Sequence, residues 1–314
     1  MKLKKPKFWD YKHPSLVSYL LYPLSKIFEL ITKLNFKNQK SSKNIKTICV
    51  GNIYIGGTGK TSLAIELKKI LDKKEIKSCF IKKYHSDQID EIKLLEKFGK
   101  VFLEKSRFHA LEKAQKENFK IAIFDDGLQD NNISYDISFV CFNKKNFIGN
   151  GFLIPSGPLR ENLNNLKNYQ NIFLNGNNED LTQIKNTLMK KNVNSIIFDT
   201  EYDPLNIKDF NLNDSYVVFS GIGNHATFVD MLNKNKFNIM QDIEFPDHYE
   251  YSEDDIKKII ELATKNNAKI LTTEKDYLRL EKFRNKDIKY IKVQLKIKDT
   301  ERLKKLLDKL HESY

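Results

Sequence analysis

The stretch Ile48-Cys49-Val50-Gly51, which leads into Gly56-Gly57-Thr58-Gly59-Lys60-Thr61-Ser62, decides the fold class of this chain. The first group is typical of a buried strand, and the second opens a segment whose apolar residues recur with helical spacing. Glycines between a strand and a helix let backbone N–H groups approach phosphate oxygens, and the helix N-terminus favours an anion. Lys60 would reach the β- and γ-phosphates, and the Thr61 hydroxyl could ligate Mg²⁺. The stretch therefore predicts that residues 56–62 bind a nucleoside triphosphate.

One position departs from the usual form of this phosphate-binding pattern. The pattern G-x-x-x-x-G-K-[ST] begins with glycine, where this chain has Tyr54. The alternative is a glycine-rich turn that only joins a strand to a helix. The run Gly59-Lys60-Thr61-Ser62 at a helix start favours nucleotide binding over that alternative.

Length and periodicity predict an α/β fold. A chain of 314 residues suits one large or two ordinary domains. Segments with strand and helix periods alternate, which favours a largely parallel sheet with helices on both faces. The strand candidates are residues 45–50, 78–81, 121–124, 137–142, 171–174, 195–198, 216–219, 238–243, 269–271 and 288–297.

A polar stretch after Asp203-Pro204 indicates a domain boundary near Asn206. We expect an N-terminal helical segment over residues 1–36, a nucleotide-binding domain over residues 37–206 and a smaller α/β domain over residues 207–314. A ribbon or a swapped terminal strand that connects the two halves is the alternative.

The formal charge of +13 is carried mostly by lysine and is spread along the chain. Nucleic-acid binding would need basic residues interleaved with exposed aromatic residues on one face, and no such stripe is evident. We expect no nucleic-acid partner. A basic surface suits an anionic membrane leaflet or a phosphorylated substrate, and compositional bias explains it equally well. The cysteines, Cys49, Cys79 and Cys141, lie in apolar runs and are interpreted as buried hydrophobic residues of a protein in a reducing compartment.

The N-terminus has the pattern of an amphipathic helix. Residues 14–25 carry no charge, and apolar residues recur at spacings of three and four at Leu16, Leu20, Leu24, Ile27, Ile31 and Leu34. Lys26 and Glu29 interrupt this run before it reaches the about 20 apolar residues that span a bilayer. Basic residues precede it at Lys2, Lys4, Lys5, Lys7 and Lys12. We expect a helix that lies on the cytoplasmic face of a membrane and is kinked or divided at Pro23, with a core-packing helix as the alternative.

A second chemical cluster is Asp125-Asp126-Gly127-Leu128-Gln129, directly after the apolar run of residues 121–124. Acids at the end of a strand are what a P-loop enzyme uses to hold Mg²⁺ opposite the phosphate loop. A turn or a helix cap is the alternative. The upstream phosphate loop favours a metal role for Asp125 and Asp126.

The order of these and further motifs resembles the tetraacyldisaccharide 4′-kinases, the lipid A 4′-kinases of Gram-negative bacteria. The resemblance covers nearly the whole chain. Besides the phosphate loop and the Asp125 cluster, the matching motifs are Asp90-Glu91-Ile92, Gly149-Asn150-Gly151, Ile154-Pro155-Ser156-Gly157-Pro158-Leu159-Arg160-Glu161, Phe219-Ser220-Gly221-Ile222-Gly223-Asn224, Phe245-Pro246-Asp247-His248-Tyr249 and Leu271-Thr272-Thr273-Glu274-Lys275-Asp276.

The resemblance implies a P-loop kinase fold and transfer of the ATP γ-phosphate to the 4′-hydroxyl of a tetraacyl glucosamine disaccharide 1-phosphate. It implies ATP and Mg²⁺, a lipid A precursor as acceptor, and a peripheral or monotopic place on the cytoplasmic side of the inner membrane. No protein partner is expected. The alternative function is a P-loop ATPase that acts as a conformational switch or partitioning protein.

The resemblance also implies a base for the acceptor hydroxyl. Asp90 matches the family's catalytic aspartate, and His248 matches the histidine that pairs with it. A positioned pair would orient the base and raise its proton affinity. A helix cap is the alternative role for Asp90, with Glu91 as a first-turn charge or a further metal ligand.

Three more residues are candidates for contacts with phosphate or substrate. Arg107 and Arg160 suit phosphate because a guanidinium donates two parallel hydrogen bonds. A surface ion pair is the alternative, for Arg160 with the adjacent Glu161. Asn224 would face the ligand from a loop at a strand end, or only form a tight turn before a helix. The run Thr272-Thr273-Glu274-Lys275-Asp276 matches the family, and its residue types also suit a cap and salt link at a helix start.

Some positions depart from the family. The usual S-R-G-Y-G stretch is replaced by Ile81-Lys82-Lys83-Tyr84-His85, and the segment from there to Asp90 is shorter. Asp130 replaces a histidine, and His225 replaces a proline. From the replaced and shortened segment before Asp90, we expect that the loop lining the site is remodelled.

Overall fold

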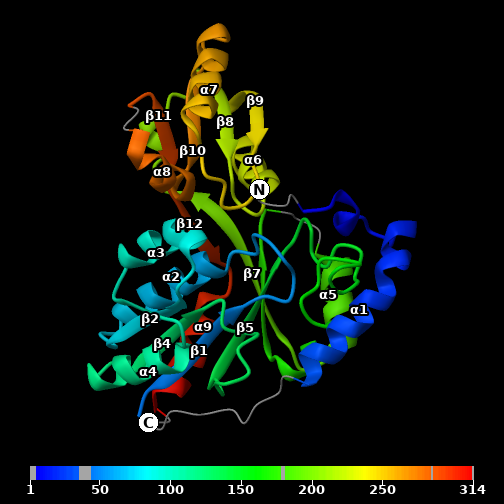
Figure 1. The fold of residues 1–314 in the computed structure, drawn as a ribbon. Helices are drawn as coiled ribbons and strands as arrows, with labels where there is room; N and C mark the ends of the chain where they lie inside the picture. The colour runs from blue at the N-terminus through cyan, green and yellow to red at the C-terminus, as the bar shows by residue number, and fades with distance from the viewer. Residues whose placement is uncertain (1–4, 35–43, 178–180, 284–285, 313–314) are drawn as a thin grey trace.

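The computed structural model of this chain describes residues 5–34, 44–177, 181–283 and 286–312. Lys2, Lys4 and the expected boundary between residues 36 and 37 lie outside the described residues. Two sheets organise the described chain, one of eight strands and one of four. Figure 1 shows the smaller sheet and its helices beside one end of the larger sheet.

The larger sheet has the strand order β12-β7-β6-β5-β1-β4-β2-β3, and its neighbouring strands are parallel except for β12 and β7. Its strands are β1 (Lys46–Gly51), β2 (Ser78–Lys83), β3 (Val101–Glu104), β4 (Ile121–Asp125), β5 (Ile137–Asn143), β6 (Asn171–Asn175), β7 (Ile196–Pro204) and β12 (Val293–Ile297). The central strands are buried along nearly their whole length, as expected where helices cover both faces. The short edge strand β3 was not predicted from the sequence.

Helices cover both faces of the larger sheet, which confirms the predicted fold class. One face packs against α2 (Lys60–Asp72), α3 (Ile89–Glu96) and α9 (Thr300–Glu312), and the other against α4 (Arg107–Lys116) and α5 (Thr182–Lys191). Successive side chains of β1 point to opposite faces of the sheet, so Ile48 lies in the core on the α2 side and Cys49 lies in the core on the α5 side.

The smaller sheet is parallel and has the order β11-β10-β8-β9. Its strands are β8 (Ser215–Ser220), β9 (Asn238–Glu244), β10 (Lys269–Thr273) and β11 (Ile288–Ile291). One face packs against α6 (His225–Lys234) and the other against α7 (Glu253–Lys265). We call each sheet with the helices packed on it a unit. Helix α8 (Glu274–Leu280) follows β10 in the smaller unit and contacts α3 of the larger unit. Short 3₁₀ helices occupy Lys7–Asp10, Ser86–Gln88, Leu163–Asn168, Ile207–Asp209 and Glu281–Phe283.

The C-terminus departs from the expected organisation. The single strand predicted over residues 288–297 is two strands in different sheets, because the chain leaves the smaller sheet after Ile291. Strand β12 then pairs antiparallel with β7, and Leu295 and Ile297 bury their side chains in the larger core together with Leu303 of α9. Residues 293–312 therefore belong to the larger unit and not to residues 207–314 as one domain. The swapped terminal strand is the arrangement observed.

Helix α1 (Leu16–Leu34) lies at the periphery of the molecule (Figure 1). Pro23 lies inside it, so of the two expected effects of this proline, a kink or a division, the helix is not divided. Its large apolar residues face outward, with Leu16 83% and Leu20 79% exposed. Its serines face inward: Ser18 accepts a hydrogen bond from Asn150, and Ser25 donates to the carbonyl of Leu153. No helix among the described residues is long and apolar enough to cross a membrane.

Candidate functional site

The phosphate loop connects β1 to α2, where the glycines predicted it. Gly59 has φ +84°, a conformation that favours glycine, and it stands at the N-cap of α2 without a side-chain cap. The Asn52 amide holds the loop by donating to the carbonyl of Tyr54 at 2.6 Å and to the hydroxyl of Thr58 at 3.0 Å. Because Gly59 has no side chain to cap the first N–H groups of α2, this helix start suits an anion.

The two acids at the end of β4, Asp125 and Asp126, face this loop because β1 and β4 are adjacent, with Val50 opposite Asp125. The Thr61 hydroxyl donates to Oδ2 of Asp125 at 3.2 Å. Asp125 is fully buried, and its Oδ1 atom has no hydrogen-bond partner among the described residues. These described residues contain no cluster of three or more His, Cys, Asp or Glu side chains that could hold a metal ion by itself.

Asp126 is the centre of a group of cations. Its Oδ1 atom lies 3.7 Å from Nζ of Lys60 and 2.9 Å from Nη1 of Arg160. Burial would raise the pKa of the Asp126 carboxyl, but Lys60 and Arg160 outweigh it and lower the pKa to about 2. Arg107 donates to the Asp126 carbonyl at 2.6 Å. Lys60, Arg107 and Arg160 therefore meet at one residue of the β4 end.

The alternative role of Arg160, a surface ion pair with the adjacent Glu161, is not what the described residues show, because Arg160 pairs with Asp126. Glu161 instead accepts hydrogen bonds from Gln129 and Tyr169. Arg107 also contacts Asp130 at 3.4 Å, the residue that replaces the family's histidine. At this departure from the family, a carboxylate therefore lies beside Arg107.

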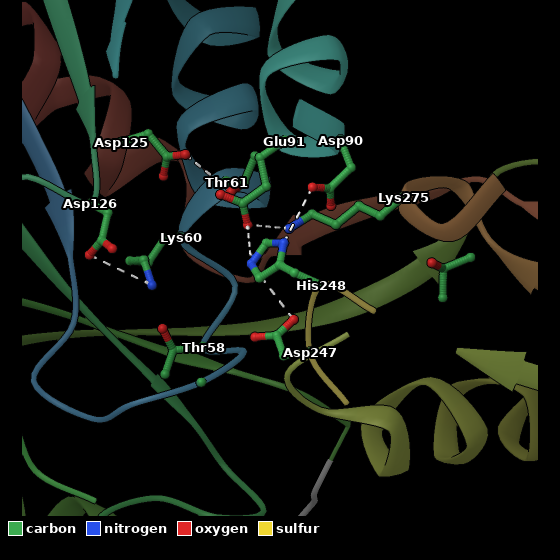
Figure 2. A network of polar contacts seen from close by, with 12 residues as sticks. Thr58, Lys60, Thr61, Asp90, Glu91, Asp125, Asp126, Asp247, His248 and Lys275 are labelled. Atoms are coloured by element: carbon green, nitrogen blue, oxygen red, sulfur yellow. Dashed lines mark hydrogen bonds and ion pairs between the residues drawn. The ribbon is translucent and has the colours of Figure 1, made fainter. Parts of the chain in front are cut away.

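Asp90 and His248 come together from the two units. Asp90 lies in the first turn of α3, and His248 lies in the loop between β9 and α7. The His248 Nδ1 atom is 3.3 Å from Oδ1 of Asp90, and Figure 2 shows the imidazole between the acids of α3 and Asp247. His248 has φ +55°, an uncommon conformation that is enriched at functional sites.

Arg279 of α8 completes this pair, and the sequence analysis missed it. Its Nη2 atom donates to Oδ2 of Asp90 at 2.6 Å. Burial alone would raise the pKa of the Asp90 carboxyl, but the His248 hydrogen bond and the charges of Lys275 and Arg279 outweigh it, so the pKa lies below its ordinary value. The expectation that the pair raises the proton affinity of Asp90 is therefore wrong. The only sequence signal for Arg279 was its place one helical turn after Asp276.

The run from Thr272 to Asp276 begins α8 and holds the Arg279 side chain in position. The Thr273 hydroxyl caps α8 by accepting from the Asp276 N–H at 3.1 Å. Asp276 is fully buried and accepts from the Gly221 N–H, the Tyr251 hydroxyl and Arg279. This run thus caps a helix and also holds the side chain that contacts Asp90.

Glu91 lies between two lysines, one from each unit. Lys82 donates to its Oε2 atom at 2.7 Å, and Lys275 donates to its Oε1 atom at 2.6 Å. Burial would raise the pKa of the Glu91 carboxyl, but these two ammonium groups hold it well below its ordinary value. Lys82 also donates to Oδ2 of Asp125 at 2.8 Å. Sequence reasoning selected Glu91 and Asp125 but not the lysine between them.

The loop of Gly221 to Asn224 packs against the phosphate loop. A Cβ atom on Gly223 would lie 2.2 Å from the Gly57 nitrogen, so only glycine fits this approach. Asn224 caps α6 by accepting from the Thr227 N–H at 3.0 Å, and its Nδ2 atom is buried without a partner among the described residues. The backbone of Gly223 in the smaller unit therefore contacts the phosphate loop. The adjacent Asn224 has a side-chain N–H donor without a partner among the described residues.

Known proteins share this arrangement of motifs. A family model described as Tetraacyldisaccharide-1-P 4′-kinase matches residues 17–312. The chain belongs to this family. It is 58% identical to the tetraacyldisaccharide 4′-kinase of Pelagibacter ubique over 312 residues, 99% of each chain, and 32% identical to that of Rickettsia canadensis over 95% of this chain and 94% of the relative. The resemblance and the expectation of a kinase are thereby confirmed.

A solved structure supports the fold. LpxK from Aquifex aeolicus, crystallised in complex with ATP, is 22% identical, has a TM-score of 0.69, and matches 94% of this chain and 100% of its own length. In the present chain, His225, which stands where the family usually has proline, is buried at the start of α6. It contacts the Ser220 hydroxyl at 2.7 Å and Asp242 at 3.0 Å, which joins β8 to β9.

Proposed function

We propose that this protein transfers the γ-phosphate of ATP to the 4′-hydroxyl of a tetraacyl glucosamine disaccharide 1-phosphate, a precursor of lipid A. The observation that carries the proposal is the Asp90–His248 pair, which lies beside the phosphate loop (Figure 2). An ATPase that uses water has no need of an acceptor site assembled from two units. A sugar hydroxyl needs in-line positioning and a group that accepts its proton.

Residues 56–62 would hold the nucleotide phosphates. The free N–H groups at the start of α2 would donate to the β-phosphate, and Lys60 would leave Asp126 to contact the β- and γ-phosphates. Ser62 follows in the first turn of the same helix. Arg160 and Arg107 would add positive charge on the side of Asp126, and the unpaired Nδ2 of Asn224 would donate to a phosphate or sugar oxygen.

Mg²⁺ fits the end of β4. The Thr61 hydroxyl and the unpartnered Oδ1 of Asp125 are hard oxygen ligands that are already adjacent, and phosphate oxygens and water complete such sites. Asp126 is a further candidate ligand. When bound, the ion would neutralise charge on the transferring phosphoryl group. Both oxygens of Glu91 already contact lysines, so we assign it no metal role.

Asp90 would act as the base in this mechanism. Arg279 and His248 fix its carboxylate, which leaves it ionised at neutral pH. A strongly basic group is not needed, because the hydroxyl becomes acidic as its oxygen bonds to the loose metaphosphate-like group. The proton would pass to the Asp90–His248 pair, and His248 would reach its place when the smaller unit closes on the phosphate loop.

Helix α1 would lie in the membrane interface and bring the enzyme to its lipid acceptor. Its exposed residues form an apolar face that no described residue covers: Leu16, Leu20, Leu24, Ile27 and Ile31 are each more than half exposed. A helix with such a face and lysines nearby binds anionic leaflets without spanning them. We place the protein on the cytoplasmic side of the inner membrane, where ATP is present.

The deciding assay presents detergent-solubilised tetraacyl disaccharide 1-phosphate with γ-labelled ATP and Mg²⁺. We expect a 4′-phosphorylated lipid as the labelled product. Release of labelled inorganic phosphate without labelled lipid, from folded protein that binds ATP, would favour the switch or partitioning ATPase instead.

A further inference from the structure

Lys82 is the most deeply buried cation of the site, and the proposed reaction gives it no role. It lies on β2 with 2% of its side chain exposed, and its two partners, Asp125 and Glu91, are 0% and 14% exposed. An ammonium group in such a place must be fully paired, because desolvation of an unpaired charge costs several kcal/mol. The Lys82 contacts at 2.7 and 2.8 Å meet this condition.

These contacts extend into a row of alternating charges. The row runs from Asp125 at the phosphate loop to Lys82, then to Glu91 of α3, and ends at Lys275 of α8 in the smaller unit. Glu91 is the residue next to Asp90 in the chain. The row therefore joins the end of β4, the helix that carries the base, and the unit that supplies His248.

The row also joins the first turn of α3 to the larger sheet. Gln88, at the N-cap of α3, makes no side-chain capping hydrogen bond among the described residues, and the helix is eight residues long. Its apolar side chains, Ile92, Leu94 and Leu95, are buried further along. Among the described residues, the side-chain hydrogen bond that joins this first turn to the larger sheet is the one from Lys82 to Glu91.

We propose that Lys82 is a positioning residue, which places Asp90 relative to the phosphate loop by holding Glu91 against Asp125. This proposal rests on the proposed function for the reaction it serves. Because its described contacts are both with carboxylates, we assign Lys82 itself no contact with the hydroxyl or the transferred phosphate. Loss of its charge leaves two buried carboxylates facing one another, and their repulsion moves α3 and its base away from the phosphates.

The experiment compares Lys82→Met, Lys82→Arg and Glu91→Gln with the parent protein. Lys144→Met is the matched control, because Lys144 is equally buried, with 2% of its side chain exposed, and pairs with Asp199 outside the site. Lipid phosphorylation gives kcat and KM. ATP binding with excess EDTA, measured by calorimetry, reports on the phosphate loop without turnover.

We expect Lys82→Met to lower kcat about 100-fold, the loss typical of a displacement of about 1 Å, while its KM for ATP and its ATP affinity in EDTA change less than about threefold. Lys82→Arg should recover about a tenth or more of the parent kcat. Lys144→Met should lower the melting temperature with a kcat within about threefold of the parent.

A Lys82→Met protein that folds and keeps the parent kcat would overturn the proposal. So would equal losses in Lys82→Met and Lys144→Met, since the effect would then be general destabilisation. If Lys82→Met does not fold, Glu91→Gln decides: it keeps Lys82 beside Asp125, and an unchanged kcat would refute the role of the row. Absence of lipid phosphorylation by the parent refutes the proposed function instead, so the two failures are distinguishable.

Discussion

The Nδ1 atom of His248 lies 3.3 Å from Oδ1 of Asp90, although 158 positions separate the two residues in the chain. One residue belongs to the unit of the phosphate loop and the other to the smaller unit, and α8 contributes Arg279 to the same carboxylate. The site therefore exists only when the two units are in contact.

Replacement of Asp90 by Asn should lower kcat by about 100- to 10,000-fold, the usual range for loss of a general base. ATP affinity should remain within about threefold, because Asp90 contacts no residue of the phosphate loop. His248→Ala should have the same pattern with a smaller loss. His109→Ala, at an exposed position of α4, is the control. Normal turnover of Asp90→Asn would remove Asp90 from the mechanism.

Arg279→Met should lower kcat by about 10- to 100-fold, since Asp90 loses the contact with Nη2 and Asp276 is left buried without its guanidinium. Arg279→Lys keeps one charge but not the two-pronged geometry, so it should recover only part of the activity. Steady-state kinetics on the lipid acceptor would measure both. Complete recovery by lysine would mean that charge alone is needed at this position.

Gly223→Ala should impair use of ATP, because its Cβ atom would lie 2.2 Å from the Gly57 nitrogen. Overpacking of this kind costs about 1–3 kcal/mol, so we expect kcat/KM for ATP to fall by about 5- to 160-fold. Gly99→Ala is the control, because its Cβ atom would meet the flexible end of Lys68. An unaffected Gly223→Ala protein would show that the two loops separate before the nucleotide binds.

Leu16→Glu combined with Leu20→Glu should abolish sedimentation of the protein with phosphatidylglycerol vesicles. These side chains are 83% and 79% exposed, so the free energy of unfolding should change by less than about 0.5 kcal/mol. Val193→Glu, at a residue 76% exposed outside α1, adds one such charge away from the helix and should leave vesicle binding intact. Retention of vesicle binding by the double variant would place the membrane contact elsewhere.

The stability of the protein should fall in acid partly through Asp126. Its pKa is about 2 in the folded protein, against an ordinary value of 3.8, so its contribution is present above about pH 4 and disappears as the pH falls toward 2. A shift of this size corresponds to about 2 kcal/mol. Asp126→Asn should therefore be less stable than the parent at pH 7 by about that amount. Urea titrations without nucleotide or divalent ions should show the difference shrinking between pH 4 and pH 2.

The sequence was sufficient for features that depend on local patterns. Alternating periods predicted parallel strands between helices, the glycines before Lys60 predicted the turn between β1 and α2, and the spacing of Leu16, Leu20 and Ile27 predicted one apolar helical face. These succeed because backbone conformation and amphipathicity follow from neighbouring residues. Packing overrides the local signal elsewhere: α1 continues through Pro23 as one helix, and residues 288–297 split between two sheets.

By itself, the sequence determined the class of fold, the phosphate loop and, through its ordered motifs, the kinase family. Only the tertiary structure decided which charges meet. It paired Lys82 with Asp125 and Glu91, brought Arg279 to Asp90, and turned the serines of α1 inward so that its leucines remain exposed. The physical reason is that electrostatic energy depends on distance in space and on burial, and neither is encoded in the spacing of residues along the chain.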